Sequence, residues 1–143
     1  MREATALNPY IVRIVWENES VSEIDLHEWL NKSKWFSPVL ESDAVWNSLH
    51  VDEFGWNIVW NGCEMEIPSA TMWRLYQEQT CQAMSRSDFI SWLERHDLSL
   101  VKASTTLGLS RRMVTYYKSG ERIIPRTVLL ACKAVDAEPG LRQ

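Results

Sequence analysis

The chain has 143 residues, of which 45% are hydrophobic and 24% are charged, and its formal net charge is −4. This balance is typical of a globular protein rather than a disordered or fibrous one. No apolar run approaches the roughly 20 residues that a membrane span needs, and the first residues lack the apolar segment of a secretory signal. The three cysteines form no CxxC motif, which suggests neither a disulfide framework nor a zinc site. We therefore expect a cytoplasmic protein without a membrane segment, metal or cofactor.

Charge divides the chain into an acidic half and a basic half. Residues 1–83 hold 5 Lys and Arg against 13 Asp and Glu, a net charge of −8, whereas residues 84–143 hold 10 against 6, a net charge of +4. Seven of the eight tryptophans also lie before residue 83. A change of sign between halves indicates modules with different partners. We predict two domains, 1–82 and 83–143, of which the second is suited to a polyanion.

Strand signals open the first domain. Residues 11–16 are β-branched and aromatic, and residues 21–26 alternate at a period of two, so the two segments are expected to form a hairpin. A short helix is expected around residues 28–31. Ser42 offers an N-cap for another helix over residues 43–49.

The rest of the first domain predicts a second hairpin and a helix. Residues 51–60 suit a hairpin with Gly55 at its turn, and residues 61–62 form an Asn-Gly turn into a strand at 64–67. A helix is expected over residues 70–82. The prediction is a small α+β domain with an antiparallel sheet and short helices.

No residue pattern in the first domain indicates catalysis. His27 and His50 are isolated and match no metal-ligand spacing, and Glu64 and Glu66 share one face of an expected strand, which usually faces solvent. The whole chain lacks a nucleophile elbow, a phosphate-binding loop and a metal triad. We predict that the protein is not an enzyme and has no catalytic or metal-binding residue. Four tryptophans are expected mainly in the core, and any exposed ones would mark a partner surface: Trp16, Trp46, Trp56 and Trp60.

Short motifs spread over residues 9–78 follow one pattern: Ile24-Asp25-Leu26, Trp35-Phe36, Asp43-Ala44-Val45-Trp46, Val51-Asp52 with Gly55, Ile58-Val59-Trp60-Asn61-Gly62, Ile67-Pro68 and Leu75-Tyr76. In these motifs the first domain resembles a small bacterial domain family of unknown function. Members of that family occur alone, fused to helix-turn-helix domains, or near toxin–antitoxin genes. The resemblance implies a fold and a genomic setting, and no site.

The second domain carries the caps and stops of four short helices. Serines suit the N-cap positions, and Gly108 and Gly120 suit the left-handed residue that ends a helix. The predicted helices run through residues 88–95 after Ser85 or Ser87, 100–107 after Ser99, 111–119 after Ser110, and 127–135 after Pro125. We predict an all-α bundle in this half.

The turn between the second and third of these helices requires particular residue types at fixed spacings. Ser104 is small where the two helices would cross, and Gly108, four residues later, allows a positive φ. Two short helices joined by such a turn form a helix-turn-helix. The apolar side chains expected to be buried around this turn are Leu107, Leu109, Val114 and Tyr117.

The segments that form this pattern are Leu98-Ser99, Ala103-Ser104-Thr105-Thr106-Leu107-Gly108-Leu109-Ser110, Val114, Tyr117, Ser119-Gly120-Glu121-Arg122 and Pro125-Arg126. In these segments, residues 84–137 are similar to the lambda-repressor-like (Cro/C1, xenobiotic-response-element type) helix-turn-helix family. Ser104 stands where that family usually has Ala. Leu100 stands where it has a polar residue, often Gln, that contacts a phosphate. The two domains together resemble a bacterial DNA-binding protein of this class.

The predicted recognition helix, residues 110–119, enters the major groove with its N-terminal half. Because Val114 and Tyr117 point inward, the side chains expected to face base edges are Arg111, Arg112, Thr115 and Tyr116. Arg binds guanine in bidentate fashion, and Thr contacts a base edge or a thymine methyl. The residues expected to meet phosphates are Ser99, Lys102, Ser110 and Lys118. The family resemblance implies that Arg122 and Arg126 reach the backbone or the minor groove.

We therefore predict a sequence-specific DNA-binding transcriptional regulator that binds double-stranded DNA as a homodimer, with half-sites about 34–36 Å apart. An alternative function is protein interaction, with the acidic amino-terminal domain binding a basic partner protein, as an antitoxin would. A neighbouring gene for a small basic protein would favour the alternative.

Overall fold

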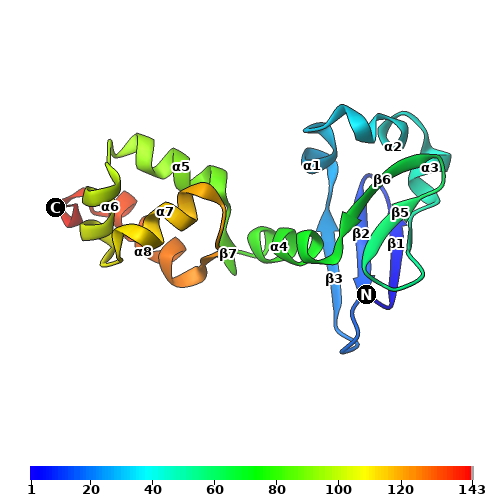
Figure 1. Cartoon of the computed structure of the whole chain (residues 1–143), viewed down its shortest axis with the longest axis horizontal. Helices are drawn as coiled ribbons and strands as arrows, with labels where there is room; N and C mark the ends of the chain where they lie inside the picture. The colour runs from blue at the N-terminus through cyan, green and yellow to red at the C-terminus, as the bar shows by residue number, and fades with distance from the viewer. Residues whose placement is uncertain (143) are drawn as a thin grey trace. The chain divides into compact units, whose positions relative to one another are not determined.

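The computed structural model describes residues 1–142 (Figure 1). Contacts divide the chain into two compact units, Met1–Tyr76 and Gln77–Gln143, which we call the amino-terminal and carboxyl-terminal units. The division falls within α4 (Ser69–Gln79), a few residues before the boundary predicted after residue 82. Within residues 1–142, no helix is long and apolar enough to cross a membrane.

The amino-terminal unit opens with a three-stranded antiparallel sheet in the order β1 (Glu3–Leu7), β2 (Ile11–Val15) and β3 (Val21–Asp25). The predicted β2–β3 hairpin is confirmed: Val12 pairs with Ile24, and both side chains are fully buried. The sequence does not predict β1, because two of its five residues are Ala, which has a weak strand preference.

A second antiparallel sheet has the order β4 (His50–Val51), β5 (Asn57–Trp60) and β6 (Cys63–Pro68). The predicted turns lie at Gly55 and Gly62, which have φ of 75° and 89°. The register shifts along β6, so that residues 64–66 form a β-bulge opposite β5. All three residues of this bulge are exposed, as expected for Glu64 and Glu66.

Short helical elements complete the amino-terminal unit: α1 (His27–Asn31), the 3-10 helix η1 (Lys34–Phe36), α2 (Ser37–Glu41) and α3 (Asp43–Asn47). The predicted cap is confirmed, since the Ser42 hydroxyl accepts a hydrogen bond from the Val45 N–H at 3.3 Å. The α4 helix buries Met72 and Leu75. The fold of this unit is therefore α+β, as expected.

The four tryptophans expected in the core differ in burial. Trp46 and Trp60 are 2% and 4% exposed, and Trp16 is half-buried. Trp56 is 67% exposed, so its assignment to the core is wrong. Its ring instead lies against the exposed Phe54, with 5.4 Å between the ring centroids.

Trp56 is exposed because of the turn that joins β4 to β5. The Asp52 carboxylate accepts hydrogen bonds from the Trp56 N–H and from the Asn57 side-chain amide, both at 2.9 Å. Burial raises the pKa of Asp52, but these hydrogen bonds outweigh it and hold the pKa below its ordinary value. The turn thus fixes Trp56 through its backbone, and its side chain points outward.

Helices dominate the carboxyl-terminal unit, as predicted (Figure 1). Its elements are β7 (Ala83–Met84), α5 (Arg86–Arg95), α6 (Leu100–Leu107), α7 (Arg111–Ser119), β8 (Ile124–Pro125), α8 (Arg126–Ala137) and the 3-10 helix η2 (Pro139–Leu141). The α7 helix packs against α5 and α6, and α6 also contacts α8. Trp92, fully buried in the core, donates from Nε1 to the Cys132 carbonyl at 3.1 Å.

Candidate nucleic-acid interface

The α6–turn–α7 segment has the caps that the sequence predicts. The Ser99 hydroxyl accepts from the Lys102 N–H at 3.2 Å, and the Ser110 hydroxyl accepts from the Met113 N–H at 3.1 Å. Gly108 ends α6 in the left-handed conformation, with φ of 67° and ψ of 31°. These local bonds set the start of each helix and the turn between them.

Packing around the turn also follows the predicted register, with one addition. Val114 and Tyr117 are buried, and Leu107 and Leu109 pack against the same core. Ser104 is only half-buried, and its hydroxyl donates to the Val101 carbonyl of its own helix at 2.7 Å. The small side chain that is fully buried in α6 is Ala103, the preceding residue.

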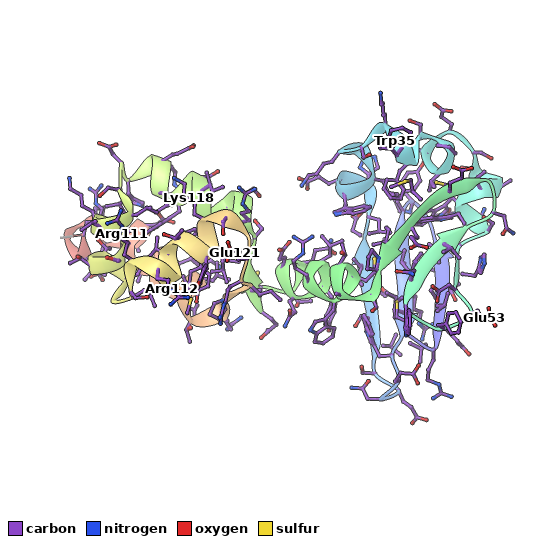
Figure 2. The ribbon with its side chains drawn as sticks, viewed as in Figure 1. Trp35, Glu53, Arg111, Arg112, Lys118 and Glu121 are labelled. Carbon is purple, nitrogen blue, oxygen red and sulfur yellow. The ribbon has the colours of Figure 1, made fainter. Side chains whose placement is uncertain are left out.

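The opposite side of α7 faces solvent. Arg111, Arg112 and Thr115 are exposed, and Tyr116 is half-buried. Figure 2 shows Arg111 and Arg112 on the outside of the carboxyl-terminal unit. The Thr115 hydroxyl donates to the Arg111 carbonyl at 3.0 Å, so its proton is already used within the helix. Its methyl group remains the free part of the side chain.

Tyr116 lies beside two guanidinium groups. Arg112 Nε donates to the Tyr116 hydroxyl at 2.6 Å, and the central guanidinium carbon of Arg112 lies 5.4 Å from the centroid of the tyrosine ring. The central carbon of Arg122, from the loop after α7, also lies 5.4 Å from this centroid. The predicted contacts do not include this cluster, although the spacing of four residues between Arg112 and Tyr116 on one helix is a usable signal for their pairing.

Lys118 lies on a different side of α7 from Arg112 (Figure 2). It borders a small hollow, of about 170 Å³, together with residues of α5 and the turn after it, including Glu94 and Asp97. The carbonyl of Lys118 accepts from Arg86 Nε at 2.7 Å. Arg86 therefore places a cation at the carboxyl end of α7, where the helix dipole favours it.

The remaining predicted contact residues, Lys102, Arg122 and Arg126, are all exposed. Lys102 is exposed near the start of α6, and Arg122 is exposed in the loop before β8. Arg126 begins α8 and donates from Nη1 to the Cys81 carbonyl at 2.8 Å, so part of its guanidinium is bound within the unit. In the described part of the chain, none of these cations forms an ion pair with a carboxylate.

Another basic residue of the unit is neutralised locally. The Asp136 carboxylate of α8 lies 2.6 Å from His96 Nε2 and 3.0 Å from Arg95 Nη2. The hydrogen bond from His96 and the adjacent Arg95 guanidinium hold the pKa of Asp136 below its ordinary value. Arg95 thus joins α5 to α8 and is not part of the basic surface of α7.

The histidines and the buried cysteine have structural partners. The His27 ring stacks on Tyr10 with 5.5 Å between centroids, and His50 Nδ1 lies 2.8 Å from the Ser48 carbonyl oxygen. Burial raises the pKa of the Cys132 thiol to about 12, so the thiol stays protonated near neutral pH. Among residues 1–142, no three His, Cys, Asp or Glu side chains gather as a metal site requires.

No protein-family model and no curated protein sequence matches the chain. Among solved structures, the chain is similar to the crystal structure of "Putative DNA Binding Protein NE0471 from Nitrosomonas europaea ATCC 19718", with 34% sequence identity and a TM-score of 0.52. The similarity covers 94% of this chain and 84% of that protein's chain. Identity at this level over nearly the whole chain reflects common descent as well as a common fold. The chain therefore belongs to the same protein family as this Nitrosomonas europaea protein.

Proposed function

We propose that the protein is a sequence-specific DNA-binding transcriptional regulator whose carboxyl-terminal unit is a lambda-repressor-like helix-turn-helix. The observation that carries the proposal is the exposed face of α7, where Arg111 and Arg112 stand free of carboxylates while Val114 and Tyr117 hold the helix on its core. A helix presented in this way suits the major groove, with its N-terminal residues against base edges. The name of the Nitrosomonas europaea relative, which describes that protein as DNA-binding, supports the same function.

Phosphate contacts would come from the helix starts. The first backbone N–H groups of α6 and α7 have no partner inside their helices, and they attract anions. Ser99 and Ser110 use their hydroxyl oxygens as caps, which leaves each hydroxyl proton available to a phosphate. Lys102 adds a nearby positive charge. Lys118, on the α5 side of α7, is the weaker candidate, because Glu94 and Asp97 border the same hollow.

A binding assay with a charge-matched control tests this function. Full-length protein is titrated by fluorescence anisotropy against duplexes from the region upstream of its own gene and against duplexes selected from a random pool. We expect the Arg111→Ala/Arg112→Ala variant to bind the selected duplex at least roughly tenfold more weakly, since each bidentate Arg–base pair contributes about 1–3 kcal/mol of discrimination. The control, Arg2→Ala/Arg13→Ala, removes two charges from the amino-terminal unit and should bind normally. Equal loss in both variants would contradict the assigned interface.

We further propose that the protein binds DNA and its partner in the cytoplasm and catalyses no reaction. His27 stacks on Tyr10, the His50 ring nitrogen lies near the Ser48 carbonyl, and His96 is paired with Asp136. Cys132 is a protonated core residue. The sequence also lacks a nucleophile elbow, a phosphate-binding loop and a metal triad.

A second function, partner binding by the acidic unit, is favoured by exposed aromatic side chains. Trp35, Phe54 and Trp56 are 65%, 69% and 67% exposed, and large exposed apolar groups often mark interaction sites. A hollow of about 560 Å³ next to Trp35 is lined by Trp35, Pro38, Gly62, Cys63, Glu64 and Met65. We propose a basic partner protein for this acidic surface, as in an antitoxin. Co-purification with a small basic protein encoded by a neighbouring gene, abolished by Trp35→Ala but not by Arg112→Ala, would support it.

A further inference from the structure

We infer that Arg112, Tyr116 and Arg122 form one binding site for a guanine base and a neighbouring backbone phosphate of duplex DNA, with Tyr116 as the residue that positions both guanidinium groups. This inference rests on the proposed function and specifies its ligand. It assigns different chemistry to the two arginines. It also gives a role to a tyrosine that touches each of them.

Packing of α7 holds the Tyr116 end of the site in place, and pairing of β8 holds the Arg122 end. Tyr116 is half-buried on α7, one residue before the core residue Tyr117. Arg122 belongs to the loop that leaves α7 at Gly120, where φ is 85°, and that enters β8. Pairing of Ile124 with Met84 of β7 anchors the far end of this loop. The tyrosine ring and the Arg122 backbone therefore have defined positions before any ligand binds.

Among the described residues, no carboxylate pairs with the two positive charges of this site. Two guanidinium groups beside one ring repel each other, and the electron-rich ring face attracts each of them. The nearest carboxylate in sequence, Glu121, forms no ion pair with either arginine in the part of the chain that the structure describes. An acceptor-rich ligand would relieve this repulsion, and DNA offers such groups at guanine and at phosphate.

The guanidinium group of Arg112 is oriented to hydrogen-bond with the edge of a base. Its Nε–H is committed to the Tyr116 hydroxyl at 2.6 Å, so the terminal pair of nitrogens remains free. This planar fork matches the O6 and N7 acceptors of guanine in the major groove. Arg112 is the second residue of α7, in the helix half that enters the groove.

Arg122 is suited to the backbone instead. It lies outside the helix, in the loop after Gly120, and no described residue accepts a hydrogen bond from its guanidinium. Loops beside a recognition helix run along the groove wall, where phosphates are the accessible acceptors. A phosphate contact carries no base preference, but it adds to the salt dependence of binding.

Tyr116 acts through these arginines by restricting them in the free protein. Ordering a long side chain on binding weakens affinity, and a side chain that is already ordered avoids this loss. Tyr116→Phe keeps the ring and removes only the hydroxyl that orients Arg112. We expect it to weaken binding to the guanine-containing duplex by about threefold to tenfold, with no change in the salt dependence.

The test uses the full-length protein and its selected duplex. Affinities are measured by anisotropy at several salt concentrations for the wild type, Tyr116→Phe, Arg112→Ala and Arg122→Ala. The matched control is Tyr10→Phe, the same chemical change in the amino-terminal unit, where the tyrosine hydroxyl donates to the Leu40 carbonyl at 3.3 Å. Each duplex is compared with a copy in which the selected guanine is replaced by 7-deazaguanine, which lacks the N7 acceptor. Thermal unfolding confirms that every variant is folded.

The expected pattern separates the three residues. The 7-deazaguanine duplex binds the wild type more weakly, but Arg112→Ala binds the two duplexes equally. Tyr116→Phe loses affinity and part of the guanine preference, and Tyr10→Phe behaves as wild type. Arg122→Ala lowers the slope of log affinity against log salt by about one for each bound copy. Because Arg112→Ala probes the same guanine, the inference stays testable even if Tyr116→Phe folds poorly.

Three results would overturn the inference while the proposed function stands: a wild type that binds DNA with no guanine preference, a Tyr116→Phe variant that binds as Tyr10→Phe does, or an unchanged salt slope in Arg122→Ala. If the wild type binds no duplex at all, the proposed function fails and this inference fails with it.

Discussion

At the scale of single residues, two neighbouring tyrosines of α7 show how helical geometry assigns a side chain to core or surface. Tyr117 is 5% exposed and packs edge-on against Phe89 with 6.0 Å between centroids. Tyr116, turned by about 100° around the helix axis, lies instead beside Arg112 and Arg122. One residue type therefore stabilises the fold at one position and orders a basic surface at the next.

The glycine that ends α6 is needed for its conformation and not for space. A Cβ at Gly108 would meet no atom within 4 Å, but φ is 67°. We expect Gly108→Ala to lower the free energy of unfolding by about 1–2 kcal/mol, the penalty of an L-residue in the left-handed region. Gly108→Asn should lose less, because Asn tolerates this region. Urea unfolding of both variants checks this, and equal losses would contradict the conformational explanation.

Asp136 should make stability depend on pH in a defined direction. Its pKa in the folded protein lies below the ordinary 3.8, chiefly through the hydrogen bond from His96. A lowered carboxyl pKa stabilises the fold above the ordinary value, and this contribution is lost as pH falls through the folded value. We expect Asp136→Asn to be less stable than wild type at pH 7 by about 1 kcal/mol, a small figure because the carboxylate is partly exposed.

Urea unfolding at several pH values measures this contribution. The gap between wild type and Asp136→Asn should shrink as pH falls below 4. Glu94→Gln, an exposed change on α5, is the control and should show a smaller gap at pH 7. A gap that stays constant with pH would show that Asp136 stabilises the unit by packing alone.

At the scale of elements, the segments predicted from the sequence are those with local signals. Serine caps at Ser42, Ser99 and Ser110 and left-handed glycines at Gly108 and Gly120 are chemical features of one short stretch each, and all are present. Elements that depend on distant partners were not predictable. The two-residue β7–β8 ladder joins residues about 40 positions apart, and two residues carry no periodicity.

The candidate site divides in the same way. Exposure of Arg111, Arg112 and Thr115 follows from the helical period once Val114 and Tyr117 are buried. The placement of Arg122 beside Tyr116 depends on where the loop after Gly120 returns, which the sequence does not show. The exposure of Trp56 was wrongly predicted because tryptophan is usually buried, whereas here the Asp52 turn holds it outward.

The start of α7 allows stability and DNA binding to be separated with one substitution. Asp is as good an N-cap as Ser, and its negative charge also suits the positive end of the helix dipole. We expect Ser110→Asp to unfold at the same temperature as wild type or slightly above it. Its carboxylate would repel a phosphate at the same place, so DNA affinity should fall at least roughly tenfold.

The control for this experiment is Ser110→Ala, which removes the cap without adding charge. It should lose about 1 kcal/mol of stability and bind DNA more tightly than Ser110→Asp does. If Ser110→Asp binds as well as wild type, the start of α7 does not face a phosphate.

At the scale of the whole molecule, the opposite charges of the two halves suit a division of labour. The carboxyl-terminal half, at +4, offers the cations that a duplex requires, and the amino-terminal half, at −8, would be repelled by one. The exposed aromatic side chains lie in the acidic half, where a protein partner meets no competing polyanion. The proposed DNA binding and the proposed partner binding would therefore use different units of the chain.

The number of copies on the DNA can be found from the salt dependence of binding. If two copies bind and each neutralises about three phosphates, log affinity falls against log salt with a slope of about −5. Lys102→Ala would remove one proposed phosphate contact from each copy, so we expect the slope to weaken by about two for a homodimer and by about one for a monomer. Lys133→Ala removes an exposed charge that is not among the proposed contacts, and it should leave the slope unchanged. Equal effects of both substitutions would mean that the general charge of the unit, rather than an oriented α6–α7 surface, attracts the duplex.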